Sequence, residues 1–409
     1  MSADRSKVKG KAVRKSTKIA AVGILSAGLV LTGCAPDQSG GDDGVDGGTA
    51  VNVGMITSIT GPLATYGEAY RHGFEAGLDY ATGGTGEIDG IDLTIEWVDD
   101  QGNPDTAVNQ SKDLIGQGFQ ILAGSAASGV ALQVAEQASQ NNVLFISGPA
   151  ATDPVTGIND QTFRSGRQTY QDVATAATFL DDLEDAKIVV FAQDNAFGQG
   201  NVDSVEAVLG AEGADVESIL VAEDATEFTP FAQQIRSAEP DLVFVAWAGA
   251  TTGAMWEALA QQDVLADTTV VTGLADRASY QAYGPGTGDI DFLNHYFPGV
   301  TDNEAAQAMD AYLEEQGHEA DLFTVDGFVA AQMLLHAITE GQGDVDAMIA
   351  ALEGWSFESV KGTLTIRAED HALIQPMFHV GMVEEDGVWV PELLDTVDGE
   401  TVAPPVAEG

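Results

Sequence analysis

Residues 119–146, FQILAGSAASGVALQVAEQASQNNVLFI, decide the fold class of this chain. The apolar run 119–123 predicts a buried strand, residues 129–141 have helical spacing, and residues 143–146 predict a second strand. Upstream, the same alternation gives strands at 51–57 and 91–98 and helices at 66–80 and 106–116. Strands that alternate with helices indicate an α/β fold with a parallel sheet and right-handed crossovers.

The alternation starts again beyond residue 169 and predicts a second α/β lobe. Its strands are expected at 187–191, 216–221, 242–246 and 269–272, and its helices at 170–183, 201–209, 228–238 and 252–261. Two further helices, 304–316 and 324–340, and two late strands, 362–366 and 377–383, follow. The acidic, proline-containing segment from Pro391 is predicted to be loosely held.

The N-terminus has the pattern of an export signal. Seven Lys/Arg residues precede an uncharged, mostly apolar run at 19–33, which is too short for an ordinary membrane-spanning helix. The run ends in Leu31-Thr32-Gly33-Cys34, which resembles a bacterial lipobox. We therefore expect a signal peptide at 1–33, lipidation of Cys34 and a flexible, acidic, Gly-rich tether at 34–50. The alternative is an ordinary secretory signal with an incidental cysteine.

Charge excludes several classes of partner. Residues 1–33 hold seven of the 16 Lys/Arg and one of the 64 Asp/Glu, which leaves nine against 63, a formal net charge of −54. A chain this acidic lacks the basic patches that bind nucleic acid or anionic lipid. The acidic surface suits a saline habitat. Because Cys34 is the only cysteine, no disulfide can form within the chain.

The sequence offers no pattern for enzyme chemistry, so we expect neither an enzyme nor a cofactor. The six histidines are scattered without the spacing of a zinc site. The segment around Ser125 and Ser128 lacks the flanking glycines of a nucleophile elbow, and no phosphate-binding loop occurs. The remaining alternative of this kind is an exported hydrolase on an α/β scaffold.

Two loops at the carboxyl edge of the predicted sheet suit a small zwitterion. Ser128 begins a helix, where free backbone N–H groups and a hydroxyl can hold a carboxylate, although a plain N-cap has the same appearance. In the next loop, Ala150 C=O could accept from an ammonium group and Thr152 could donate to a carboxylate. An ordinary turn is the alternative for this loop.

Colinear segments resemble the type I periplasmic solute-binding proteins of the branched-chain amino acid (Leu/Ile/Val) and amide ABC transporter family. No single motif decides this resemblance, but the order of the matching segments along the chain does. The matching segments are TGPLATYG at 60–67, VDD at 98–100 with Asn103-Pro104, SGVAL at 128–132, SGPAAT at 147–152, Phe163-Arg164 and DNAFGQG at 194–200.

The resemblance implies two Rossmann-like lobes joined by three crossings, with the ligand in the cleft between them. Lobe 1 would comprise 51–168 and 294–369, lobe 2 would comprise 169–293 and 370–395, and 396–409 would be a loose tail. The resemblance implies that Tyr66 packs on the ligand and that Ser128, Ala150 and Thr152 hold its polar groups. Phe197 stands where the second lobe of the family often offers Tyr, so a hydroxyl is missing there, and Trp247 would form part of the second-lobe wall. A core position is the alternative for Trp247.

A second position also departs from the family pattern. The family's amino-acid binders place a carboxylate after the strand near residue 272, where this chain has Asp276 and Arg277. Arg277 or Arg167 could pair with an extra ligand carboxylate, and a salt bridge to one of the many acids is the alternative for both.

The implied function is that of an exported, lipid-anchored, monomeric receptor. It would deliver a branched-chain or other amino acid to an ABC permease and ATPase on other chains. An amide, urea-like or carboxylate ligand stays open, as does a sensor that signals to a partner.

Overall fold

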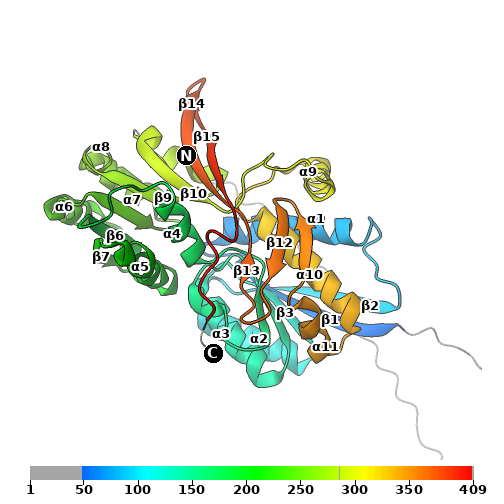
Figure 1. The fold of residues 1–409 in the computed structure, drawn as a ribbon. Coiled ribbons are helices and arrows are strands. Elements are labelled where there is room, and N and C mark those ends of the chain that lie inside the picture. The colour runs from blue at the N-terminus through cyan, green and yellow to red at the C-terminus, as the bar shows by residue number, and fades with distance from the viewer. Residues whose placement is uncertain (1–47, 285, 408–409) are drawn as a thin grey trace, which may run out of the picture. The chain divides into compact units, whose positions relative to one another are not determined.

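The computed structural model describes residues 48–284 and 286–407, which belong to one compact unit (Figure 1). The predicted signal peptide 1–33, the lipidation site Cys34 and most of the tether 34–50 lie outside the described residues. In the part of the chain that is described, no helix has both the length and the hydropathy needed to cross a membrane.

The first sheet contains five parallel strands in the order β2-β1-β3-β4-β5 (Figure 1). The strands are β1 (Thr49–Thr57), β2 (Ile91–Asp99), β3 (Ile121–Gly124), β4 (Leu144–Ser147) and β5 (Thr162–Arg164). The connecting helices are α1 (Ala64–Ala81), α2 (Pro104–Gly116) and α3 (Ser128–Asn141). Apolar clusters cover both faces of this sheet, and β3 and β4 are therefore buried along their whole length.

The second sheet repeats this order and extends it. Its parallel strands are β6 (Lys187–Gln193), β7 (Asp215–Val221), β8 (Leu242–Ala246), β9 (Thr269–Gly273) and β10 (Ile290–Asn294). The full order is β15-β14-β10-β9-β8-β6-β7, with β14 (Met377–Glu385) and β15 (Val388–Val397) antiparallel at one edge. Its helices are α4 (Thr169–Ala177), α5 (Ala196–Val208), α6 (Thr229–Ala238), α7 (Thr252–Gln261) and α8 (Val264–Asp267).

Later segments of the chain complete the first half. The helices α9 (Glu304–Gln316), α10 (Thr324–Gly341) and α11 (Val345–Leu352) precede a three-stranded sheet of β11 (Ser356–Ser359), β12 (Gly362–Ile366) and β13 (Leu373–Ile374). The described residues also form four short 3-10 helices: η1 (Asp153–Val155), η2 (Gly210–Glu212), η3 (Arg277–Tyr283) and η4 (Thr287–Asp289). We call the five-stranded sheet with α1–α3, α9–α11 and β11–β13 the first lobe, and the seven-stranded sheet with α4–α8 the second lobe.

Helix α10 packs closely on α1, beside which it runs in Figure 1. Glycine makes this approach possible at two positions. A Cβ atom on Gly73 would lie 1.8 Å from the carbonyl oxygen of Thr324, and one on Gly327 would lie 1.9 Å from that of Tyr70. Because α10 covers α1 and one face of the first sheet, its side chains from Val325 to Leu335 are almost all buried.

The chain near residue 370 differs from the predicted lobe boundary. Residues 370–395 are predicted to lie in the second lobe, whereas β13 pairs with β12 through Leu373 and Ile366. The strand belongs to the first lobe because its backbone groups are satisfied there. The chain therefore passes to β14 at residues 375–376.

The segment after Pro391 also differs from the prediction. It belongs to β15, which pairs with β14 through a two-residue turn at Asp386 and Gly387. Both residues have positive φ values, 52° and 84°, which suit an Asp-Gly hairpin turn.

The predicted loose tail at 396–409 is held against the first lobe in its described part. Arg367 Nη1 donates to Pro404 C=O at 2.7 Å, and Asp370 Oδ2 accepts from the Ala407 N–H at 2.9 Å. Val402 is fully buried. Backbone groups of this segment that water would solvate in a loose tail are therefore bonded to the first lobe.

Candidate ligand-binding site

A cavity of about 390 Å³ lies between loops at the carboxyl ends of the two parallel sheets. The first lobe contributes the start of α1, the start of α3 and the loop after β4. The second lobe contributes the ends of β8 and β9 and the start of α5. Carboxyl ends of parallel strands are the usual place for ligands in α/β folds.

The start of α3 opens into this cavity through Ser128, Gly129 and Val130. The first backbone hydrogen bond of the helix runs from Ala131 N–H to Ala127 C=O at 3.0 Å, so the preceding N–H groups have no acceptor inside the helix. Ala127 makes no side-chain cap. Ser128 is therefore not a plain N-cap, and its Oγ accepts weakly from Thr152 N–H at 3.4 Å. This arrangement can hold an anion.

The loop after β4 does not present its polar groups as predicted. Pro149 and Ala151 line the cavity, whereas Ala150 and Thr152 lie behind this lining and are buried. The hydroxyl side chain of Thr152 packs towards Gly200 of α5.

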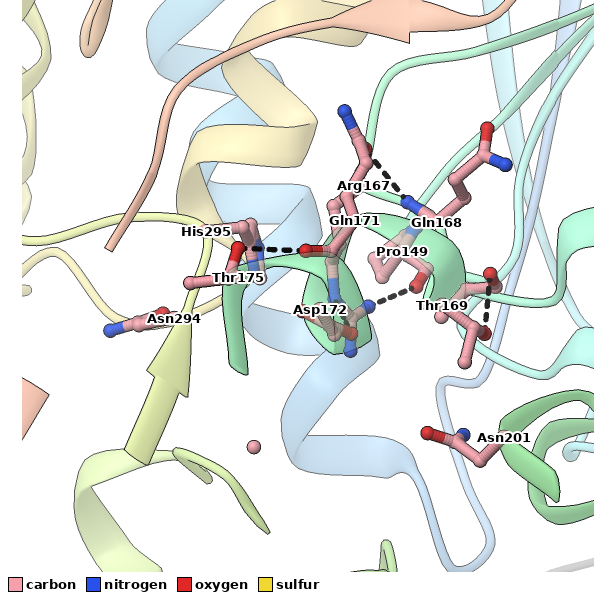
Figure 2. A network of polar contacts seen from close by, with 12 residues as sticks. Pro149, Arg167, Gln168, Thr169, Gln171, Asp172, Thr175, Asn201, Asn294 and His295 are labelled. Carbon is pink, nitrogen blue, oxygen red and sulfur yellow. Dashed lines mark hydrogen bonds and ion pairs between the residues drawn. The ribbon is translucent and has the colours of Figure 1, made fainter. Parts of the chain in front are cut away.

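Two buried arginines already use the carbonyl groups of this loop. Arg164 Nη2 donates to Ala150 C=O at 3.4 Å and to Thr152 C=O at 3.0 Å. Arg167 Nη1 donates to Pro149 C=O at 3.2 Å, as Figure 2 shows. The carbonyl that is predicted to accept from a ligand ammonium therefore faces a guanidinium group.

Arg167 itself lines the cavity, although only 9% of its surface is exposed. Its Nε forms an ion pair with Asp172 Oδ2 at 3.2 Å, and its guanidinium lies 5.9 Å from the ring centre of Phe323. Burial raises the pKa of the Asp172 carboxyl group, and the charge of Arg167 opposes this shift. Figure 2 shows Asn201 of α5 across from this pair, and Asn201 also lines the cavity.

Aromatic side chains form much of the remaining wall. Tyr66 and Phe323 pack with ring centres 4.6 Å apart, and Phe197 and Trp247 face the cavity from the second lobe. Burial raises the pKa of the Tyr66 phenol, which stays protonated. Trp247 also packs on Phe191 at 5.1 Å, so it serves both the cavity wall and the core.

The family model described as "Periplasmic binding protein" matches residues 50–387. The chain belongs to the periplasmic binding protein family. Members of this family bind small-molecule solutes and work with the permease and ATPase components of ABC transporters.

Individual relatives agree with this membership. "Leu/Ile/Val-binding protein homolog 3" of Brucella melitensis is 26% identical over 337 residues, which cover 81% of this chain and 90% of that protein. A crystal structure of an "ABC-type branched-chain amino acid transporter" from Rhodopseudomonas palustris is 27% identical with a TM-score of 0.71, covering 87% of this chain and 99% of the other. A solute-binding protein from R. palustris in complex with 4-hydroxybenzoate is 21% identical with a TM-score of 0.78, covering 85% and 97%, and shares the fold.

Two further predicted site residues of this periplasmic binding protein lie outside the cavity lining. Asp276 caps η3 by accepting from Ser279 N–H at 3.1 Å. Arg277 forms an ion pair with Glu319 at 3.3 Å and donates to Ala320 C=O at 2.9 Å. Arg277 is therefore engaged as the salt-bridge alternative describes, and the residue that reaches the cavity here is Ala275.

Several lining residues of this binding protein are missed by sequence reasoning. Leu322 and Phe323 precede α10, far along the chain from Tyr66, and no motif marks them. Asn201 lies within α5, in the turn after the predicted DNAFGQG segment, so its position next to that match is the only signal. In the described ranges no group of three or more His, Cys, Asp or Glu side chains suits a metal ion.

Proposed function

We propose that the protein is an extracytoplasmic receptor that captures a small, mostly apolar carboxylate-bearing solute for an ABC importer. The observation that carries this proposal is the start of α3, whose free N–H groups open into a cavity walled by aromatic side chains from both lobes. The names of the relatives support a Leu/Ile/Val-type amino acid. The benzoate-type ligands in structures of the same fold support an aromatic carboxylate.

Each part of the site has a distinct task in capture. The N–H groups of residues 128–130 and the Ser128 hydroxyl hold the carboxylate, where the helix dipole favours negative charge. Tyr66, Phe323 and Trp247 cover the apolar part and remove it from water. Closure of the two lobes around the solute then buries it. Tyr66 can take part in closure because it belongs to a cluster with residues of both lobes: its ring packs on Phe323, and Ala248 of the second lobe packs against the same cluster.

We also propose that Cys34 carries a lipid that holds the receptor at the outer face of the membrane. The lipobox-like segment Leu31–Cys34 supports this step. Replacing Cys34 by Ser is expected to move the receptor from the membrane fraction to the soluble fraction in its host. Retention of the C34S variant in the membrane fraction would contradict lipid anchoring.

Solute binding is tested by calorimetry on the purified full-length chain. The panel contains leucine, isoleucine, valine, phenylalanine, benzoate, 4-methylpentanoate and 3-phenylpropanoate, with glucose and putrescine as controls that lack a carboxylate. We expect at least one carboxylate-bearing solute to bind and to raise the unfolding temperature, because it binds only the folded state. Binding of a control solute alone would overturn the proposal.

A further inference from the structure

We propose, resting on the function proposed above, that the solute is an apolar or aromatic monocarboxylate without an amino group, anchored by the α3 N-terminus and Arg167. The proposed site would thus reject α-amino acids of the same shape.

The anion-binding half of the site has two independent sources of unused N–H donors. The free N–H groups of residues 128–130 provide the first. Arg167 provides the second, because its Nε and Nη1 are engaged by Asp172 and Pro149 while its Nη2 has no partner among the described residues. Both sources line the same cavity, and their unused N–H groups favour an anion there.

Arg164 adds to this preference from behind the lining. Its side chain is 1% exposed, and its Nε and Nη1 lack hydrogen-bond partners in the described part of the chain. Burial lowers the pKa of Arg164 to about 10, so the group stays charged near neutral pH. The carboxylates of Asp153, Asp326 and Asp172 partly balance its charge, which still opposes an ammonium group close to it.

The carbonyl groups that would bind a ligand ammonium group already accept hydrogen bonds from cationic side chains. Its acceptors would be the carbonyl groups of Pro149, Ala150 and Thr152, and each accepts from Arg164 or Arg167. An ammonium group there would compete with a guanidinium for the same oxygen and meet a like charge at close range.

The nearby carboxylates do not replace these acceptors. Asp172 lines the cavity but is paired with Arg167, and Asp276 accepts from Ser279 outside the lining. Glu223 lines the cavity, but it is exposed to solvent and accepts from Asn195 Nδ2 at 2.6 Å. The interior of the cavity therefore offers unused N–H donors and aromatic surface together.

Matched ligands that differ only in the amino group test this inference. Calorimetry on the full-length chain at pH 7 compares 4-methylpentanoate with leucine and 3-phenylpropanoate with phenylalanine. We expect the acid without the amino group to bind at least tenfold more tightly in one of the pairs. Equal or tighter binding of the amino acid in both pairs overturns the inference and leaves the proposed function standing. Failure of all seven carboxylate-bearing solutes of the panel above to bind contradicts both.

The role of Arg167 is tested with a charge-balanced variant, because Arg167→Met alone would leave Asp172 buried without its partner. In the double variant R167M/D172N, affinity for the preferred carboxylate is expected to fall at least tenfold. The preference for this acid over its own primary amide is expected to disappear. The single variant R167K, which keeps the charge, tests the same preference if the double variant fails to fold.

Arg277→Met is the matched control, because this arginine is also paired with an acid but lies outside the cavity lining. It is expected to keep wild-type affinity and the wild-type preference for acid over amide. Retention of that preference by R167M/D172N, or its loss in R277M, would overturn the assignment of Arg167 as an anchor.

Discussion

Three basic side chains, Arg164, Arg167 and Lys361, are buried although the chain has only 16 Lys/Arg residues against 64 Asp/Glu. Burial of a charge is unfavourable unless the group is paired or hydrogen-bonded. Arg164 and Arg167 bond to the loop after β4, and Lys361 Nζ donates to the carbonyl of His295 at 2.7 Å and to Gln375 Oε1. Scarce cations are thus concentrated where the chain passes between the lobes.

Ser128→Ala is expected to weaken binding of the preferred carboxylate. Loss of a hydrogen bond to a charged group costs about 1.5–3 kcal/mol, which corresponds to roughly 10- to 100-fold in dissociation constant. Ser139→Ala on the exposed side of the same helix is the control and should bind as the wild type does. Equal affinities of the two variants, measured by calorimetry, would remove Ser128 from the site.

The stability contribution of Lys361 is expected to depend on pH. Burial lowers the pKa of Lys361 to about 7, below its value of about 10.5 in the unfolded chain. Between pH 7 and 10 the unfolded state therefore holds more protons at this residue, and the free energy of unfolding should rise with pH. The rise contributed by one residue is at most about 1.4 kcal/mol per pH unit.

Urea unfolding of the wild type and of Lys361→Met at pH 7, 8, 9 and 10 measures this effect. The stability of the wild type relative to K361M should increase over the series. Lys112→Met removes an exposed lysine of α2 and is expected to give curves parallel to those of the wild type. Parallel curves for K361M as well would show that the pKa of Lys361 is not lowered in the folded protein.

Individual site residues differ in how well the sequence predicts their place in the site. Ser128 is predicted because a strand, a short loop and a helix start follow one another locally, and Arg167 is noticed because cations are rare. The sequence does not predict Phe323 as a site residue, because Phe323 contacts Tyr66 only through the packing of α10 on α1. Arg277 is predicted as a candidate ligand-binding residue from its position after β9, and this position does not show that Arg277 pairs with Glu319.

At the scale of elements, the contact between α1 and α10 depends on small residues. Gly73→Ala would place a Cβ atom 1.8 Å from the Thr324 carbonyl oxygen, and the two helices would have to separate. We expect this variant to lower the free energy of unfolding by about 3 kcal/mol or more. Denaturant unfolding monitored by circular dichroism provides the measurement.

Gly116→Ala is the matched control for this packing effect. Gly116 ends α2, is exposed, and would present its Cβ atom to open space. Because alanine favours the helix, this variant should be as stable as the wild type or more stable by up to about 1 kcal/mol. Similar unfolding curves for G73A and G116A would contradict the close approach of α1 and α10.

Elements with regular periodicity are predicted best. The strand at 362–366 and most helices of both lobes lie where their apolar patterns place them. Short strands such as β5 and β13 are missed because two or three residues carry no period. β15 is missed although the Asp386-Gly387 turn is a local hairpin signal, because acidic residues and Pro391 obscure its apolar pattern.

At the scale of the whole molecule, the net charge of −48 predicts that salt stabilises the fold. Repulsion among exposed acids opposes compaction, and its range falls from about 10 Å at 0.1 M salt to about 3 Å at 1 M. The urea midpoint is expected to rise as KCl increases from 0.01 to 1 M. A midpoint that stays constant or falls over this range would contradict the prediction.

A less acidic variant sharpens this test. Glu384, Glu385 and Glu392 lie exposed on the β14–β15 pair, and changing all three to Gln removes charge without touching the cavity. This variant should gain less stability from salt than the wild type. An equal gain would assign the salt effect to something other than repulsion among acids.

The position of α10 in the chain has a consequence for the order in which the lobes fold. All strands of the first sheet are made by residue 164, yet the apolar face that holds Val53 and Met55 is covered by α10, which begins at residue 324. The five parallel strands of the second lobe are made in between. During synthesis from the N-terminus, the parallel strands β6–β10 can therefore pair while the first sheet still exposes an apolar face to water. This face of the first sheet is therefore made early and covered only after β10, so it depends longest on protection from aggregation.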